Sequence, residues 1–389
     1  MYRRSHLAVA IVALSALALA GCGGGSQSSA LPSGGTSQSP LLNGGTGSLA
    51  RPTLYVSGQG AVFAYDLSAS GDTAPVNKDT GYYYQAGGPN GVAASIAGIA
   101  TNAAGDLIVA QNYKTPQGDG NSCQLTYIPA RTTQSAANTT SAQCSNGDYN
   151  TTGQAVGVTF TGNGAASGAF GNDVDVLMHY VPSGAANPDS CFDDKTARYE
   201  VDRYTASSGS ITPHNCIVLA NDSTGTYHAI GGSTNGAFFV DYTPTSGSDV
   251  IDRYNASSTV GTTSATGTVP GTSGPIAVAA NPTTNVGYRI VASTVGTTTS
   301  IYSFKVTGNA INLNSTLGTF TNTVAALAVD NNGKIYVGVN QPGGVTKIKV
   351  YSAGKTQATD PDYTLNNPVR RPNPSASPAA AITGMAIAQ

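Results

Sequence analysis

The feature that most constrains the fold is a short motif that recurs along the chain. Each copy has an apolar strand, a polar turn that ends in glycine, and a second apolar strand. The clearest copies are Ile99–Val109 and Leu327–Val337. This pattern predicts a β-hairpin. Looser copies lie at 157–178, 230–240 and 276–291. Self-similarity of this kind is typical of repeat architectures, so we expect one array of similar units.

A second element follows each hairpin, an alternating strand that ends in an aromatic residue. These aromatic residues are Tyr65, Tyr127, Tyr204, Tyr254, Phe304 and Tyr351. No segment shows a 3.6-residue apolar period, and Ser, Thr, Gly and Asn interrupt the chain at short intervals, which is typical of all-β proteins. The pairs Asp202–Arg203 and Asp252–Arg253 recur in neighbouring copies. Because adjacent residues of a strand face opposite ways, we expect the arginine of one unit to contact the aspartate of the next.

The repeats predict an all-β fold, a six-bladed β-propeller in which neighbouring sheets bury each other's faces. Residues 382–388 resemble the first strand of a repeat without its second, and residues 54–57 resemble a second strand without its first. We therefore expect the N- and C-terminal strands to pair and close the ring, which removes an exposed sheet edge. A pair of β-sandwiches remains the alternative architecture.

The segments 99–112 and 327–340 resemble NHL-type repeats and the related six-bladed propellers of the SMP-30/gluconolactonase class. A lactonase of that class implies a divalent metal in the central channel, held by Glu, Asn and Asp. The one glutamate of this chain, Glu200, lies on a predicted third strand away from the axis, so that ligand set does not transfer. We therefore predict no catalytic residue, no metal and no cofactor.

Residues 1–21 have the pattern of a bacterial lipoprotein signal peptide. Arg3 and Arg4 precede an apolar run that ends in the letters LAGC at 19–22, which resemble a lipobox. The resemblance implies cleavage before Cys22 and attachment of acyl chains such as palmitate to that cysteine. Several acyl chains together anchor a protein stably to a membrane.

Residues 22–51 are rich in Gly, Ser and Thr and nearly free of charge, which predicts a flexible tether. The propeller domain would then span 52–389. We expect it to lie outside the cytoplasm, lipid-anchored to a membrane of the bacterial cell envelope. The sequence does not distinguish the inner from the outer membrane.

The four cysteines other than Cys22 indicate disulfides, because an even number in an exported protein favours pairing. Three pairings are open. We predict Cys123–Cys144 and Cys191–Cys216, since each pair brackets one polar segment.

The charge balance narrows the choice of partners. The chain has 18 Lys and Arg against 20 Asp and Glu, and charged residues make up 10% of it. A nucleic-acid-binding protein needs a basic face, so this composition argues against that class. The remaining partners are the membrane, reached through the lipid, and an envelope protein or glycan.

Few residues are candidates for a binding site. Asn102 and Asp330 occupy matching turns after an inner strand, where they cap the turn and are candidate ligand-facing residues. Asp189, Asp193 and Asp194 form the densest acidic cluster, for which a solvated loop and a calcium site both remain open.

Two further sets carry weaker signals. The stretch 82–84 contains three tyrosines that fit a packing strand or a platform for stacking a sugar. His179, His214 and His228 are isolated in the sequence, which favours structural roles over general-base catalysis.

These observations favour a non-enzymatic, lipid-anchored binding or scaffolding module whose ligand the sequence does not identify. The alternative is a lactonase-like or lyase-like enzyme with a divalent metal in the central channel. An enzyme should gather polar, metal-competent side chains at the channel mouth, whereas a scaffold should line the channel with small or apolar residues.

Overall fold

A computed structural model gives the structure of most of the chain after residue 51. It describes the residue ranges 52–58, 60–76, 83–87, 93–114, 121–130, 139–144, 152–161, 173–181, 198–207, 209–220, 224–232, 236–255, 262–279, 288–369 and 381–388. Within these ranges no helix is long and apolar enough to cross a membrane.

Four antiparallel sheets of four strands account for much of the fold. The first contains β24 (Gly384–Ala388), β1 (Thr53–Gly58), β2 (Ala61–Asp66) and β3 (Tyr84–Gln85). The second contains β4 (Ala94–Thr101), β5 (Leu107–Lys114), β6 (Asn121–Ile128) and β7 (Thr140–Gln143). The third contains β8 (Thr152–Phe160), β9 (Asp173–Val181), β10 (Arg198–Ser207) and β11 (Ser210–Val218). The fourth contains β20 (Thr323–Val329), β21 (Ile335–Gln341), β22 (Val345–Tyr351) and β23 (Tyr363–Asn366), with the short 3-10 helix η3 (Pro342–Gly344) between β21 and β22.

The remaining sheet has eight strands. One half contains β12 (Thr226–Gly232), β13 (Phe238–Thr243), β14 (Val250–Tyr254) and β15 (Ala265–Thr268). The other half contains β16 (Thr272–Val278), β17 (Arg289–Val295), β18 (Thr298–Thr307) and β19 (Ala310–Phe320). A single parallel pair, Thr266 with Ala310, joins β15 to β19. The described chain therefore has five hydrogen-bonded sheets, where the sequence predicts six separate ones, because this one contact fuses two antiparallel halves.

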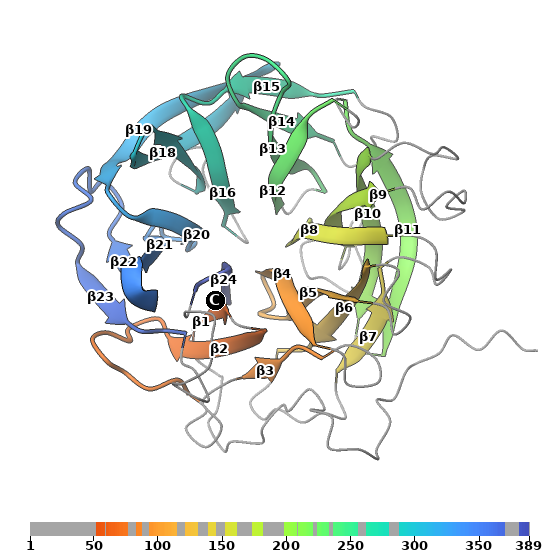
Figure 1. The fold of residues 1–389 in the computed structure, drawn as a ribbon, viewed down its shortest axis with the longest axis horizontal. Helices are drawn as coiled ribbons and strands as arrows, with labels where there is room; N and C mark the ends of the chain where they lie inside the picture. Colours follow the sequence, from red (N-terminus) through yellow and green to blue (C-terminus); the bar gives the residue numbers. More distant parts are fainter. Residues whose placement is uncertain are drawn as a thin grey trace, which may run out of the picture.

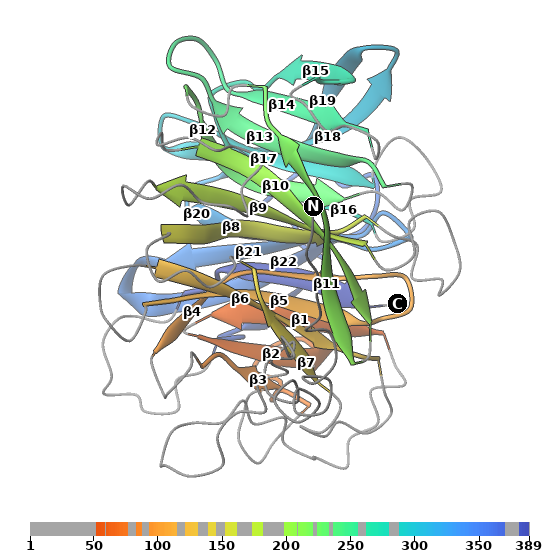
Figure 2. The same ribbon diagram turned by 90° about the vertical axis from the view of Figure 1, so that its right-hand side faces the viewer.

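The sheets are arranged as a ring, with one strand of each sheet or half-sheet next to the centre (Figure 1). The innermost strands are β4, β8, β12, β16, β20 and β24. Figure 2 shows the same sheets from the side, stacked face against face around the axis. This arrangement is a β-propeller, and it explains why the strands next to the centre are apolar on both faces.

The core lies between neighbouring sheets. Every cluster of buried apolar residues draws its members from two adjacent sheets or half-sheets. Phe239 of β13, for example, packs with Phe304 of β18 at 5.1 Å between ring centroids. The two halves of the eight-stranded sheet thus pack face to face like any other neighbouring pair.

The two ends of the described chain meet in one sheet, as the sequence predicts. β24 pairs antiparallel with β1, which places Ile387 opposite Leu54 and Met385 opposite Val56. The amide of Thr383 donates to the carbonyl of Ser57 at 2.8 Å just before the strand begins. The chain therefore completes its first sheet with its last strand, so no inner edge is left open at this point.

Candidate functional site

The central channel is the candidate site, because all the inner strands converge on it. Most of its lining side chains are apolar, and they range in size from glycine to phenylalanine. The lining residues are Ile99, Ala100, Thr101, Asn102, Val158, Thr159, Phe160, Ile230, Gly231, Gly232, Ile276, Ala277, Val278, Ala279, Leu327, Ala328, Val329, Met385, Ala386 and Ile387. The cavity has a volume of about 90 Å³, whereas pockets for small molecules have roughly 300–1,000 Å³.

The two threonines that line the channel connect neighbouring inner strands. The Thr101 hydroxyl donates to the carbonyl of Ile387 at 2.6 Å, across from β4 to β24. The amide of Gly232 donates to the hydroxyl of Thr159 at 2.7 Å, across from β12 to β8. These hydrogen bonds link different sheets around the axis. The two hydroxyl groups therefore stabilise contacts between the inner strands.

Asn102 and Asp330 cap equivalent turns, the role the sequence assigns to them. The Asn102 side-chain oxygen accepts the amides of Ala104 and Asp106 at 3.0 and 2.9 Å. The Asp330 carboxylate accepts the amides of Asn332 and Lys334 at 2.9 and 2.8 Å. Both residues are buried, with 1% and 5% of their surface exposed. The second interpretation, contact with a ligand, stays a prediction.

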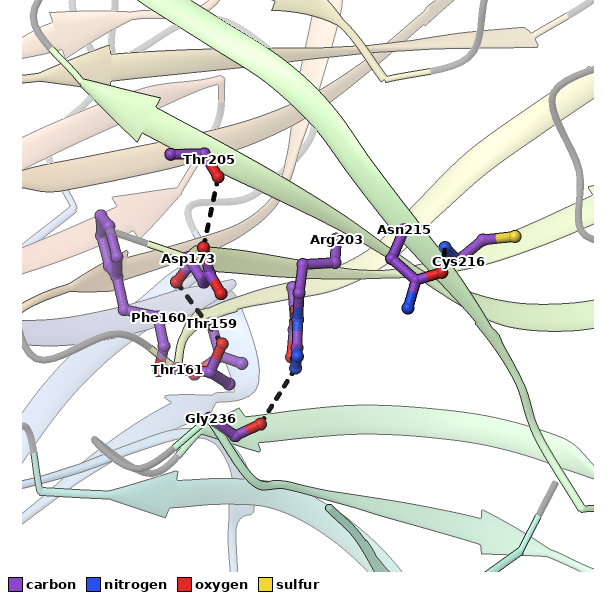
Figure 3. Close-up of polar contacts among 10 residues, drawn as sticks. Thr159, Phe160, Thr161, Asp173, Arg203, Thr205, Asn215, Cys216 and Gly236 are labelled. Atoms are coloured by element: carbon purple, nitrogen blue, oxygen red, sulfur yellow. Dashed lines mark hydrogen bonds and ion pairs between the residues drawn. The ribbon is translucent and has the colours of Figure 1, made fainter. Parts of the chain in front are cut away.

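Beside the channel lies a buried polar cluster that the sequence does not predict (Figure 3). Arg203 of β10 and Asp175 of β9 stand directly opposite each other and are 3% and 0% exposed. Two parallel hydrogen bonds join them, Nε to Oδ1 at 2.6 Å and a terminal guanidinium nitrogen to Oδ2 at 2.7 Å. The same guanidinium donates to the carbonyl of Gly236 at 3.0 Å, a residue just before β13.

Within this cluster the positive charge of Arg203 is paired with the negative charge of Asp175. Burial acts to lower the pKa of Arg203, but the hydrogen bonds and charge of Asp175 outweigh burial and raise it. The neighbouring Asp173 carboxylate accepts the Thr205 hydroxyl at 3.3 Å. Bidentate pairing of this kind fixes geometry and leaves no charge to act on a substrate. The cluster therefore joins β8–β11 to the next half-sheet. It also corrects the expected contact of Arg203 with an aspartate of the next unit, because the carboxylate comes from its own sheet.

A second buried acid has no such partner. Asp241 of β13 is 0% exposed, and neither of its carboxylate oxygens accepts a hydrogen bond from the described residues. The nearby Ser273 hydroxyl donates to Asp249 instead, at 2.9 Å. Burial raises the pKa of Asp241 to about 8, against smaller lowering contributions from Ser273 and Ala229. No sequence signal singles out this residue, since only its position on β13 places it in the core.

The other candidate side chains occupy structural positions or lie outside the described residues. Tyr83 and Tyr84 are buried, and the Tyr84 hydroxyl donates to Gln111 at 3.1 Å, as a packing strand requires. Glu200 is buried in β10, the third strand of its sheet. Cys22, Tyr82, Asp189, Cys191, Asp193 and Asp194 lie outside the described residues.

The histidines are separate from one another. The His179 ring stacks on Tyr199 at 4.3 Å, and burial lowers its pKa. His228 shares a hydrogen bond of 2.8 Å with the Thr243 hydroxyl, and burial lowers its pKa as well. His214 lies on the outer strand β11. Among the described residues no three His, Cys, Asp or Glu side chains come together as a metal site would require.

Cys123 and Cys144 form a disulfide with a Cα–Cα distance of 5.2 Å, the pairing chosen from the sequence. It joins β6 to the residue that follows β7, and both cysteines are buried. Cys216 on β11 is also disulfide-bonded.

Comparison with known proteins identifies no family for this chain. No protein-family model matches the chain, and no curated protein does. Membership in the NHL-repeat or SMP-30 class therefore stays a prediction.

Several solved structures are similar in fold, and all three described here are propeller-type folds. A 6-phosphogluconolactonase-like protein from Bacteroides fragilis is 11% identical, with a TM-score of 0.40 over 88% of this chain and 99% of that one. TolB from Acinetobacter baumannii is 11% identical, with a TM-score of 0.43 over 87% of this chain and 66% of that one. The WD40 domain of Toxoplasma gondii coronin is 10% identical, with a TM-score of 0.34 over 82% of this chain and 66% of that one.

Proposed function

We propose that this protein is a lipid-anchored β-propeller of the bacterial cell envelope that acts as a non-enzymatic binding or scaffolding module. The observation that carries the proposal is the lining of the central channel, whose side chains are small or apolar at nearly every position. Its hydroxyl groups bridge inner strands, as Thr101 and Thr159 do. A channel of this kind stabilises the ring, and binding then takes place on the faces of the disc.

The propeller has six blades if the two halves of the eight-stranded sheet count separately. Two observations support this count. The halves are joined by one residue pair, Thr266 with Ala310. They also bury a core cluster between them, as the other neighbouring sheets do.

The anchoring part of the proposal rests on the sequence of residues 1–51. The signal-like segment, the lipobox-like letters at 19–22 and the Gly- and Ser-rich tether follow one another in the order that a lipoprotein requires. Growth of the producing bacterium with an alkyne-bearing palmitate tests it. The full chain should be labelled and a Cys22→Ser variant should not. Equal labelling of both would contradict the anchor at this residue.

The binding part is tested by photo-crosslinking from the two faces of the disc. Val295 and Val345 are exposed apolar residues, 58% and 39%, next to the turns that join β17 to β18 and β21 to β22. Asn309 is exposed in the turn at the opposite end of β18 and serves as the matched control. A binding module should give discrete adducts in the envelope from one face only.

The enzyme alternative is tested on the same purified chain. A divalent ion retained in a 1:1 ratio through gel filtration, together with lactone hydrolysis that an Ala277→Phe variant abolishes, would overturn the non-enzymatic proposal. We expect no retained ion and hydrolysis at the rate of buffer alone.

A further inference from the structure

Two exposed valines lie on neighbouring parts of the ring, at equivalent turns. Val295 ends β17 and Val345 begins β22, with 58% and 39% of their surfaces exposed. Among the residues that the structure describes, no other large apolar side chain is classed as exposed. The half-sheet β16–β19 and the sheet β20–β23 share a core cluster, and each valine borders the turn between the second and third strands of its unit. Because neighbouring units repeat one strand order, the two turns lie on the same face of the disc.

Two lysines follow Val345 on the same side of β22. Lys347 and Lys349 are two and four residues further along, and alternate residues of a strand point the same way. Both lysines are partly exposed. The Lys349 ammonium lies 5.7 Å from the centre of the Phe320 ring. Phe320 is the last residue of β19, which there pairs with the start of β18, just beyond the Val295 turn. The Lys349 ammonium is therefore directed toward the face that carries the valines.

The charges of the two lysines are not neutralised. Neither lysine forms an ion pair within the part of the chain that the structure describes. Burial lowers the pKa of Lys349, and the positive charge of Lys347 lowers it further. An anionic partner would relieve this repulsion, because it offers the opposite charge to both ammonium groups.

The acidic residues of these two units lie at the opposite face. From residue 272 to residue 366 the only acids are Asp330, Asp360 and Asp362. Asp330 caps the turn between β20 and β21, and the other two lie in the connection from β22 to β23. Lys355, in the same connection, pairs with Asp360 and Asp362 at 2.7 and 3.6 Å. The face with the valines therefore combines exposed apolar side chains with positive charge.

Apolar side chains at turn tips with lysines behind them match the surface of an anionic bilayer. The apolar side chains reach the boundary between headgroups and acyl chains, while lysines contact the lipid phosphates. Lys347 and Lys349 begin roughly 7 and 13 Å behind Val345, at about 3.3 Å for each residue. Their long apolar stems allow the ammonium groups to extend toward the headgroups.

We propose that Val295, Val345, Lys347 and Lys349 form a docking surface for the anionic lipid headgroups of the membrane that holds the protein. Each lysine strengthens binding to an anionic surface roughly fivefold, which is a weak contact for a free protein. The inference rests on the proposed anchor, because tethering raises the local concentration of the domain at the bilayer. Residues 22–51 can extend to roughly 100 Å, so either face of the disc can reach the membrane.

Tryptophan fluorescence in vesicles tests the docking, because the chain has no tryptophan of its own. Thr297→Trp places a reporter in the exposed turn after Val295, and Asn309→Trp places the matched reporter at the opposite end of β18. Each full chain, purified from the producing bacterium, is reconstituted in vesicles of brominated phosphatidylcholine and phosphatidylglycerol in equal parts. Bromine should lower the emission of Thr297→Trp by about twofold or more and leave that of Asn309→Trp nearly unchanged, since only contact with the acyl region brings a reporter to bromine. Equal quenching of the two reporters, or quenching of neither, would overturn the proposal.

Substitutions in the Thr297→Trp chain locate the contact. Lys347→Gln together with Lys349→Gln should weaken docking about 25-fold and remove most of the quenching, at roughly fivefold for each lysine. Lys305→Gln is the matched control, because Lys305 is exposed toward the other end of β18, and it should leave the quenching unchanged. Vesicles without phosphatidylglycerol should quench as little as the double lysine variant. Full quenching in that variant would overturn the assignment to these lysines.

The docking and the proposed function fail separately. Flotation of the Asn309→Trp chain with the vesicles reports the anchor alone, so a chain that floats without quenching at position 297 keeps the anchor and overturns the docking. Quenching at position 297 in a chain that palmitate does not label at Cys22 would support the docking and contradict the anchor. Discrete protein adducts from Val295 and Val345 would support the binding module but place a protein on this surface, which would overturn the docking.

Discussion

Two neighbouring parts of the ring carry the same three residues in different electrostatic settings. β10 contains Asp-Arg-Tyr at 202–204, and β14 contains it at 252–254. In the first, Arg203 stands opposite Asp175 and is fully paired. In the second, Arg253 stands opposite Phe239, and the guanidinium of Arg289 lies over that ring.

The acid is not missing from the second part but lies two residues further along the strand. β9 has Asp175 and Leu177 on one side, and β13 has Phe239 and Asp241 at the matching positions. Asp241 is therefore opposite Ile251, and one cross-strand pair separates this pair from that of Arg253. Residues two apart point to the same side of a strand. Exchanging the acidic and the apolar residue between these two positions therefore moves the aspartate from opposite the arginine to opposite the residue two positions before the arginine, without altering the backbone. The repeat thus determines the strand position of each arginine. The residue opposite it on the next strand determines whether a carboxylate neutralises its charge.

The largest expected effect on stability comes from substituting the equivalent arginine in each of the two strands, Arg203 in β10 and Arg253 in β14. Arg203→Gln leaves the buried Asp175 carboxylate unpaired and should lower the free energy of unfolding by about 3–5 kcal/mol. Arg253→Gln should change it by less than about 1 kcal/mol, because no carboxylate among the described residues forms an ion pair with Arg253. Urea denaturation of the two variants measures both values.

The double variant Asp175→Leu with Arg203→Met is the control for this comparison. Replacing both members of a buried ion pair with apolar residues is often nearly neutral. The double variant should therefore recover most of the stability that Arg203→Gln loses. Equal losses for Arg203→Gln and Arg253→Gln would show that the two settings do not differ.

The unpaired acid of the second setting should make stability depend on pH. The folded protein holds a proton on Asp241 up to a pKa of about 8, whereas an unfolded aspartate loses it near 3.9. The folded state binds the proton more tightly, so stability falls as pH rises between these two values, by up to about 1.4 kcal/mol for each pH unit.

Asp241→Asn removes this titration and should be more stable than the wild type at pH 8, with the difference shrinking toward pH 5. Thermal unfolding from pH 5 to pH 9 measures the difference. Asp249→Asn is the matched control, since the Asp249 carboxylate accepts hydrogen bonds from Ser273 at 2.6 and 2.9 Å. A constant difference between Asp241→Asn and wild type across this range would contradict the assignment.

The smallest effect concerns repulsion between the two arginines. Since Arg253 and Arg289 repel each other, Arg253→Gln should be relatively more stable in low salt than in 1 M salt, by about 0.2–1 kcal/mol. The free energy of unfolding in the two salt concentrations measures it. An effect of the opposite sign would indicate that an acid of this chain already compensates Arg253.

Much of the architecture was predictable because it follows from local pattern. The hairpin copies Ile99–Val109 and Leu327–Val337 appear as β4–β5 and β20–β21. The closing contact was predictable as well, because an unmatched strand at each end of a repeat array has only the other end as a partner.

The charged contacts were not predictable, since they depend on register between strands. Asp175 and Arg203 are paired by the alignment of β9 with β10, which no local pattern specifies. The contact between Thr266 and Ala310 that joins the two half-sheets was not predictable either. It forms where the outer strands β15 and β19 approach each other, and neither strand has a distinctive sequence motif.

Ring closure by β24 is the central claim, because it joins the two ends of the described chain in one sheet and makes the structure circular. Hydrogen exchange followed by mass spectrometry on the full chain tests it most directly. The amides of Gly384–Ala388 should be protected to the same degree as those of Thr53–Gly58, since the two strands share one set of hydrogen bonds. Exchange of the last strand at the rate of an unfolded peptide, with β1 still protected through β2, would contradict it.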